Sequence, residues 1–123
     1  MTMRLSTEVL VIGAGPAGTA AAHWAAESGR MVVLLEKETM PRERVCGDAL
    51  TPKAVGHLAD MGIEVNNKNF HQHHGLRMTA HGQSIELQWP TDHDHPSHGL
   101  AIRRRSLDKL LVEHADNTGA QVW

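Results

Sequence analysis

Apolar residues near the N-terminus fall into two short runs separated by an alanine-rich segment. The first run, at 9–12, leads directly into the sequence GAGPAG at 13–18. The second run, at 31–35, ends on Glu36. The segment between the runs predicts a helix, because its small apolar side chains keep it slim and Gly29 is placed to end it. A strand, a glycine turn, a helix, a second strand and a terminal acidic residue together predict a dinucleotide-binding βαβ unit.

The middle of the chain is more polar, and its pattern predicts one helix and one hairpin. A loop over 37–51 precedes a helix that begins at Thr51 or at the proline after it, and that ends at Gly62. Segments 76–80 and 84–89 flank a short polar turn and predict an antiparallel hairpin. The apolar residues that alternate with polar ones in its second strand are Ile85, Leu87 and Trp89.

The C-terminal part predicts a strand, a helix and another strand. A short strand at 100–102 is followed by a helix from Ser106 to about Asn117. Residues 120–123 have the pattern of the beginning of a third parallel strand. The stripe of the helix that is expected to be buried consists of Leu107, Leu110, Leu111 and either His114 or Ala115.

These elements predict an α/β fold built on a Rossmann-like βαβ unit, with an inserted antiparallel hairpin. The chain divides into the βαβ unit at 8–36, a loop and helix at 37–62, the hairpin insertion at 63–98, and a strand, a helix and the start of a third strand at 99–123. A dinucleotide-binding sheet needs further strands. We therefore expect the N-terminal portion of a larger two-domain protein; the alternative is a standalone protein with a minimal sheet.

Each residue of the glycine turn has a physical reason to be there. Gly13 allows a sharp turn out of the strand, Gly15 lets the backbone approach a pyrophosphate, and Gly18 lets the helix pack closely. Pro16 suits the first helical turn, where the N–H groups and the helix dipole face the phosphates. Glu36 can accept hydrogen bonds from ribose hydroxyls and would repel a 2′-phosphate, which favours FAD or NAD over NADP.

Composition excludes some classes of function. The chain of 123 residues has a net charge of −2 and no basic block, so nothing indicates nucleic-acid binding. The single cysteine, Cys46, cannot form an internal disulfide and suits a reducing compartment. Glu8 and the glycines inside the first apolar stretch argue against a secretory signal. No apolar run has the length of a membrane span.

Ten histidines raise the question of a metal site. One group consists of His71, His73 and His74, and the other of His93, His95 and His98 with Asp92 and Asp94. Both groups lie in polar segments that we expect to be loops, without a helix register to fix three or four ligands. Solvated loop histidines are therefore favoured, and no metal is predicted. His23 and His114 are interpreted as surface or interface residues.

The sequence resembles a known family of flavoproteins. GAGPAG, followed after seventeen residues by EK at 36–37, resembles the FAD fingerprint of the para-hydroxybenzoate hydroxylase-like flavoproteins. PR at 41–42 and CGDALTP at 46–52 are similar to the geranylgeranyl reductase branch, whose members use FAD to saturate isoprenoid double bonds. GLRM at 75–78 and WP at 89–90 look most like the actinobacterial menaquinone reductases, which hydrogenate one prenyl unit of the menaquinone tail.

This resemblance implies FAD as the cofactor and a set of residues that bind it. The glycine turn and Ala17 would bind the pyrophosphate, and Glu36 the ribose. Arg44 and the backbone after it would line the flavin side. Arg104 stands at the family's FAD-contacting position, four residues before an aspartate; the alternative is a solvated charge, as for its two neighbouring arginines. The implied cofactor-binding residues are Gly13, Ala14, Gly15, Pro16, Ala17, Gly18, Glu36, Lys37, Arg44, Cys46, Gly47, Ala49 and Arg104.

The implied reaction transfers a hydride from reduced flavin to one alkene carbon, while a proton is delivered to the other. No catalytic residue is predicted. Cys46 is a candidate for a position near the flavin and the isoprenoid tail, but a small buried thiol is the favoured interpretation, and Asp48 is interpreted as a cap or turn residue. The expected partners are a prenylated quinone or another isoprenoid lipid as substrate and an electron donor for the flavin. Such a substrate implies peripheral contact with the inner membrane face by a cytoplasmic enzyme.

Three alternatives stay open. A reductase of the same branch could act on geranylgeranyl chlorophyll precursors or archaeal-type lipids. A flavin monooxygenase or halogenase of the same superfamily would share the FAD-binding unit but not the reaction. The third is an inactive FAD-domain fragment, because the family's second FAD motif and its substrate tunnel lie beyond these 123 residues.

Overall fold

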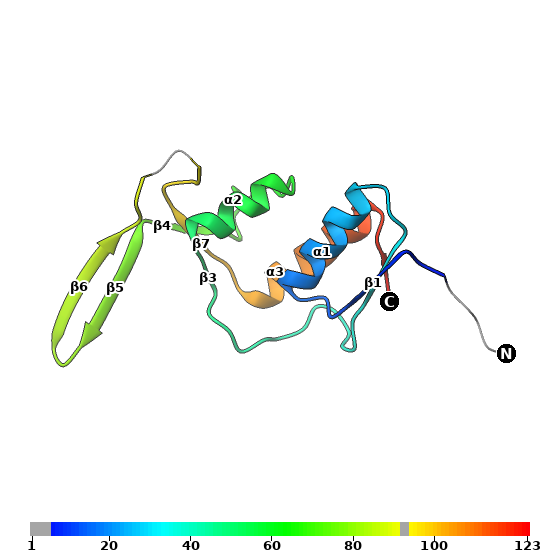
Figure 1. Cartoon of the computed structure of the whole chain (residues 1–123). Coiled ribbons are helices and arrows are strands. Elements are labelled where there is room, and N and C mark those ends of the chain that lie inside the picture. Colours follow the sequence, from blue (N-terminus) through cyan, green and yellow to red (C-terminus); the bar gives the residue numbers. More distant parts are fainter. Residues whose placement is uncertain (1–5, 92–93) are drawn as a thin grey trace. The chain divides into compact units, whose positions relative to one another are not determined.

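The computed structural model describes residues 6–91 and 94–123 and divides into two compact units (Figure 1). The first unit comprises the described residues up to Val45 together with Arg104–Trp123. The second unit comprises the described residues of Cys46–Arg103. The first unit is thus assembled from two segments that are far apart in sequence, and the second is inserted between them.

The first unit contains a parallel sheet with the strand order β1-β2-β8. Strand β1 (Val9–Ile12) pairs with β2 (Val32–Leu35), which also pairs with β8 (Gln121–Val122). Helix α1 (Pro16–Glu27) connects the first two strands, and α3 (Arg104–Thr118) precedes the third. The predicted strand–helix–strand unit and the predicted third parallel strand are therefore confirmed.

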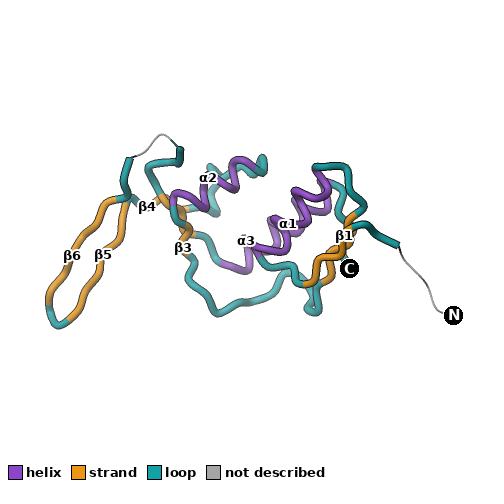
Figure 2. The backbone as a smooth tube through the Cα atoms, viewed as in Figure 1, coloured by secondary structure: helices purple, strands orange, loops and turns teal. Residues whose placement is uncertain are grey.

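One face of this sheet packs against the two helices, which contact each other (Figure 2). Successive side chains of a strand point to opposite faces, so Val9 and Val11 pack on the core while Leu10 and Ile12 point away. Leu10 is 54% exposed and Ile12 is 80% exposed. The buried residues of the core are Ala14, Ala22, Val32, Leu34, Val112, Ala115 and Ala120.

The second unit contains a small antiparallel sheet with the order β3-β7-β4. Its strands are β3 (Ala49–Leu50), β7 (Gly99–Ala101) and β4 (His71–His73). Helix α2 (Pro52–Asp60) contacts β3 and β7. The helix begins at the predicted position. Thr51 is its N-cap, and the Thr51 hydroxyl accepts a hydrogen bond from the Ala54 N–H at 3.3 Å. The buried apolar residues of this unit are Val55, Leu58, Met61, Ile63, Phe70, Leu100 and Ile102.

A separate two-stranded hairpin, β5 (Gly75–Ala80) and β6 (Gln83–Gln88), completes the second unit. The predicted hairpin is confirmed, and its residues lie almost entirely exposed. Every residue of β6 is exposed, and so are all those of β5 except Gly75. Its apolar side chains form two exposed cross-strand pairs, Leu76 with Leu87 and Met78 with Ile85.

Other boundaries also differ from the sequence pattern. The predicted loop at 37–51 contains β3, and His71 and His73 lie in β4 rather than in a loop. Both short strands exist through pairing with β7, a partner that their own sequence does not reveal. Helix α3 begins at Arg104, two residues earlier than predicted. Its buried residues are Leu107, Asp108, Leu111, Val112 and Ala115, while Leu110 is only half-buried.

Among the helices in the described ranges, none is long and apolar enough to cross a membrane.

Candidate cofactor-binding site

The glycine turn joins the end of β1 to the start of α1. Gly13 has a φ of +99°, in the region that side chains disfavour, and its N–H donates to the Leu35 carbonyl at 2.7 Å. A Cβ at Gly18 would overlap the carbonyl oxygen of Gly13. Two of the glycines are therefore required by the turn itself, independently of any ligand.

Helix α1 begins without a side-chain cap. The N-cap residue is Gly15, which has an extended conformation and no side chain that could cap the helix. Pro16 follows it. The first-turn N–H groups and the positive end of the helix dipole thus face the space in front of the turn. A Cβ at Gly15 would approach only the Arg42 Nη2 atom, at 3.9 Å. This arrangement suits the backbone binding of a phosphate.

Glu36 lies beside the turn at the end of β2 and is held there as a carboxylate. Its Oε2 atom accepts hydrogen bonds from the Ala14 N–H at 2.8 Å and from Arg42 Nη2 at 3.2 Å. Its Oε1 atom accepts one from the Glu38 N–H at 3.1 Å. Burial would raise the pKa of Glu36, but these donors outweigh that effect and lower the pKa to about 2. The residue is therefore an ionised acceptor at neutral pH.

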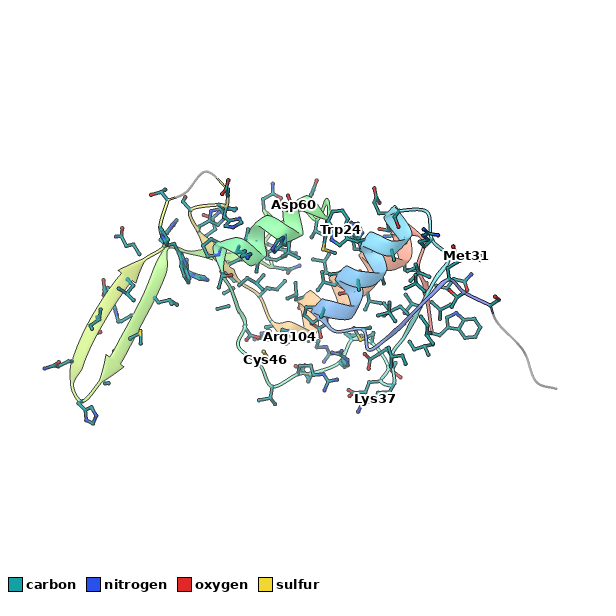
Figure 3. The ribbon with its side chains drawn as sticks, viewed as in Figure 1. Trp24, Met31, Lys37, Cys46, Asp60 and Arg104 are labelled. Carbon is teal, nitrogen blue, oxygen red and sulfur yellow. The ribbon has the colours of Figure 1, made fainter. Side chains whose placement is uncertain are left out.

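These groups border a cavity of about 790 Å³ within the first unit. Its lining contains nine of the predicted residues: Gly13, Gly15, Pro16, Ala17, Gly18, Glu36, Lys37, Arg44 and Arg104. Figure 3 shows Arg104 at the beginning of α3 and Lys37 in the loop after β2. Ala14 is buried and takes part through its amide. Beside the apolar Ile12, Leu35 and Trp123, the lining combines a glycine turn, one carboxylate and several cations. These polar groups are a suitable donor and acceptor set for a diphosphate and a ribose.

Three predicted residues lie elsewhere in the chain. Cys46, Gly47 and Ala49 belong to the second unit, and Ala49 forms part of β3. The Cys46 side chain is exposed, so its interpretation as a buried thiol is wrong. Asp48 does not supply the helix cap, which comes from Thr51; its carbonyl accepts the Ile102 N–H at 2.9 Å.

Arg42 is a buried residue of the cavity wall that the sequence analysis did not single out. It is 6% exposed, lines the cavity, and forms ion pairs with Glu36 and with Asp108 of α3. Arg104 also pairs with Asp108, at 2.9 Å. The two arginines flanking Arg104 do not line the cavity; Arg105 forms a surface pair with Glu43 at 3.3 Å. The PR dipeptide in the family motif was the signal that could have identified Arg42.

The histidines form no metal site within residues 6–91 and 94–123, where no group of three or more His, Cys, Asp or Glu side chains could hold an ion. His73 Nδ1 instead accepts a hydrogen bond from Trp89 Nε1 at 3.2 Å. Asp92 and His93 lie outside the described residues. His23 lies in the interface between α1 and α3, where its ring packs against that of His114.

A family model described as an FAD binding domain matches residues 6–123. This chain belongs to the FAD-binding domain family. FAD is therefore the cofactor. The observed geometry fits the adenosine diphosphate part of FAD, because an uncapped helix start faces a turn without side chains and an ionised carboxylate lies beside it.

Curated relatives of this FAD-binding domain include menaquinone reductases. The protein from Mycobacterium tuberculosis is 43% identical over 122 residues, which are 99% of this chain and 30% of the relative. The protein from Mycolicibacterium smegmatis is 41% identical over 120 residues, which are 98% of this chain and 29% of the relative. The chain thus spans about 30% of the length of these relatives.

Solved structures show the same fold. A flavoprotein/dehydrogenase from Cytophaga hutchinsonii matches with a TM-score of 0.84 and 32% identity, over 95% of this chain and 29% of that one. A geranylgeranyl bacteriochlorophyll reductase-like protein from Thermoplasma acidophilum matches with a TM-score of 0.77 and 30% identity, also over 95% of this chain and 29% of that one. The sequence motifs at 13–18 and 46–52 indicated a resemblance to the FAD-dependent superfamily that contains the geranylgeranyl reductases, and this resemblance is confirmed.

Proposed function

We propose that this chain supplies the FAD-binding part of a reductase that saturates a C=C bond in an isoprenoid chain, with the prenyl tail of menaquinone as the substrate. The observation that carries the proposal is the 43% identity to menaquinone reductase along nearly the whole chain. The geranylgeranyl reductase-like structural neighbour supports an isoprenoid substrate class. The CGDALTP sequence at 46–52 supports the same branch.

The residues of the cavity have distinct roles in this function. The N–H groups at the start of α1 bind the pyrophosphate, and the Glu36 carboxylate accepts hydrogen bonds from the ribose hydroxyls. Lys37, Arg44 and Arg104 surround this position with positive charge that offsets the diphosphate. Bound FAD supplies the hydride chemistry. The chain contributes binding and orientation of the cofactor, which fixes where its reactive ring can meet a double bond.

The substrate determines the expected partners and location. A prenylated quinone resides in a membrane, so the enzyme would contact the membrane surface peripherally, from the cytoplasmic face. The flavin also needs an electron donor in each turnover, because every saturated double bond consumes one hydride. These partners follow from the proposed reaction.

A flavin-dependent halogenase or monooxygenase is the second candidate. A flavin-dependent halogenase of Armillaria mellea is 34% identical over 122 residues. The chondrochloren halogenase, an FAD-dependent enzyme, matches with a TM-score of 0.82 at 25% identity. Such enzymes need oxygen to react with the reduced flavin, whereas the proposed reductase does not.

The test has two stages. In the first, the purified chain is titrated with FAD, and binding with one FAD per chain is expected. In the second, the protein expressed from the natural gene is loaded with reduced FAD without oxygen and mixed with menaquinone. The products are then reoxidised, so that any reduced quinone head returns to its original mass. A lasting gain of two hydrogens in the tail supports the proposal. Flavin oxidation that requires oxygen, with the tail unchanged, would favour the halogenase or monooxygenase.

A further inference from the structure

Four charged side chains form a continuous series along the wall of the cofactor cavity. Arg42 Nη2 donates to Glu36 Oε2 at 3.2 Å, and Arg42 Nη1 donates to Asp108 Oδ2 at 2.5 Å. Arg104 Nε and Nη2 donate to the two oxygens of Asp108 at 2.9 and 3.1 Å. The series alternates in sign and connects the end of β2, the loop after it and the first turns of α3.

Three of these four side chains are almost completely removed from water. The side chain of Arg42 is 4% exposed, that of Glu36 is 5% exposed, and that of Asp108 is 0% exposed. Charges in such surroundings are tolerated only when they are paired, and removing one partner leaves the other uncompensated. The ionised state of Glu36 therefore depends on Arg42, which lies between Glu36 and Asp108.

We propose that Arg42 is a positioning residue for FAD: it holds Glu36 at the ribose position and, through Asp108, holds Arg104 at the cavity wall. Both ends of the series line the cavity, whereas Asp108 does not. A group that binds one carboxylate with each terminal nitrogen fixes the two walls relative to each other. This inference rests on the binding of FAD in the cavity of the first unit.

A guanidinium is suited to this role, and an ammonium is not. The two terminal nitrogens of Arg42 lie in one plane and reach carboxylates that come from different elements. Lysine would keep the positive charge near Glu36 but would lose one of the two directed contacts. Arg42→Lys and Arg42→Met therefore separate the effect of charge from that of geometry.

Other charged groups also lie near the carboxyl group of Glu36. Lys37 and Arg44 line the cavity, Arg44 pairs with Glu38 at 3.6 Å, and Arg104 and Asp108 come from α3. Helix α1 contributes no acidic residue in its first turn. Only Arg42 among the cations donates to the Glu36 side chain in the described structure, so its removal should alter the Glu36 titration specifically.

The first experiment follows the Glu36 carboxyl by ¹³C NMR in the parent chain, Arg42→Lys, Arg42→Met and the control Arg105→Met, with Glu36→Gln to assign the signal. Arg105 is matched to Arg42 in chemistry but forms only an exposed pair with Glu43. In Arg42→Met the Glu36 pKa is expected to rise from about 2 into or above the ordinary carboxyl range. Arg42→Lys should give an intermediate value, and Arg105→Met the parent value.

The second experiment measures ADP binding to the same proteins by calorimetry from pH 8 to pH 5, with ADP standing for the adenosine diphosphate part of FAD. At pH 8, Arg42→Met is expected to bind ADP about tenfold or more weakly than the parent. The reason is that Glu36, no longer held in place, loses a charge-assisted hydrogen bond with the ribose. This loss of affinity should grow toward pH 5, because Glu36 with a raised pKa becomes protonated there. The ADP affinities of the parent and of Arg105→Met should change with pH in the same way. Asp108→Asn, which keeps the Arg42–Glu36 contact, should weaken binding without the added pH dependence.

The outcomes separate this inference from the proposed function. If the parent binds neither ADP nor FAD, cofactor binding by this chain fails, and the Glu36 titration still decides whether Arg42 positions the carboxylate. If Arg42→Met titrates and binds ADP like Arg105→Met, the inference is overturned even though FAD binds. If Arg42→Met does not fold, Arg42→Lys and Asp108→Asn test the inference in its place. Parent-like ADP binding by both of these variants would overturn the inference.

Discussion

At the scale of single residues, steric fit and charge pairing decide which substitutions the first unit tolerates. Gly18 is the clearest steric case, because any side chain there meets the backbone of the turn that the βαβ unit needs. Glu36 and Arg42 are the clearest electrostatic case, because each offsets the charge of the other in a buried position. His23 combines burial with a hydrogen bond, which makes it sensitive to pH.

Gly18→Ala is expected to destabilise the chain by about 3 kcal/mol, since its Cβ overlaps a carbonyl oxygen that cannot move without opening the turn. Gly47→Ala is the control: a Cβ at Gly47 meets nothing within 4 Å. It should change the free energy of unfolding by less than about 0.5 kcal/mol. Urea unfolding monitored by circular dichroism measures both, and equal stabilities would contradict the steric account.

His23 should make stability depend on pH. Its Nδ1 atom lies 3.0 Å from the Thr118 hydroxyl, which itself donates to the His114 carbonyl, so His23 donates here. Burial lowers the pKa of His23, the nearby His114 lowers it further, and Glu27 opposes the shift. Because the folded pKa lies below the unfolded value of 6.5, the unfolded state binds more protons as the pH falls.

The expected result is a loss of stability as the pH falls below about 6.5. His23→Gln should reduce this dependence, because glutamine does not titrate. His57→Gln is the control, since His57 is exposed and pairs only with the surface residue Asp60. Thermal unfolding from pH 7.5 to pH 5 measures the effect, and identical pH profiles for the two variants would exclude His23 as its source.

At the scale of elements, the two parts of the second unit differ in how much packing supports them. Strand β7 lies between two partners and contacts α2, and Leu100 within it is 1% exposed. The β5–β6 hairpin is held by backbone pairing and by surface contacts such as the ion pair between Arg77 and Glu86. Two-stranded hairpins without a packed face contribute little to stability.

Leu100→Ala is therefore expected to cost about 2–5 kcal/mol, through lost burial and the cavity left behind. Met78→Thr in β5 should cost less than about 0.5 kcal/mol, because Met78 is 61% exposed and threonine suits a strand. Urea unfolding of the purified chain compares the two. A loss at Met78 as large as that at Leu100 would show that the hairpin face is covered in solution.

At the scale of the whole molecule, the main feature is the face of the parallel sheet opposite the helices, which the described residues leave exposed. Parallel sheets are normally covered on both faces, yet Leu10, Ile12 and Trp123 are 54%, 80% and 52% exposed. Such a group of large apolar side chains is unusual on the surface of a soluble monomer. The chain that carries this group spans about 30% of the length of its menaquinone reductase relatives.

The purified 123-residue chain should therefore bind the dye ANS under native conditions, because the sheet face offers a contiguous apolar surface. Ile12→Thr should lower the ANS fluorescence while keeping the strand, since threonine favours β structure. Val45→Thr is the control: Val45 is fully exposed but lies in the loop between β2 and β3. Absence of ANS binding by the folded parent would contradict this prediction.

Much of the fold followed from local signals in the sequence. The βαβ unit, the start of α2 and the third parallel strand depend on apolar periodicity, glycine positions and a capping threonine, all contained within a few residues. The hairpin pairing was equally local. Its exposure was not predictable, because alternation shows that one face is apolar but not whether anything packs against it. The strands β3 and β4 were missed because their pairing partner lies far along the chain.

The sequence by itself determined the dinucleotide-binding unit and the position of Glu36 after the second strand, because both are written in consecutive residues. Only the tertiary structure decided that Arg42 joins Glu36 to Asp108, 66 residues away, and that His23 meets Thr118, 95 residues away. Contacts of this kind depend on how α3 packs beside α1 and the sheet. No local pattern encodes that packing, since it is the outcome of burying both helices on one apolar face.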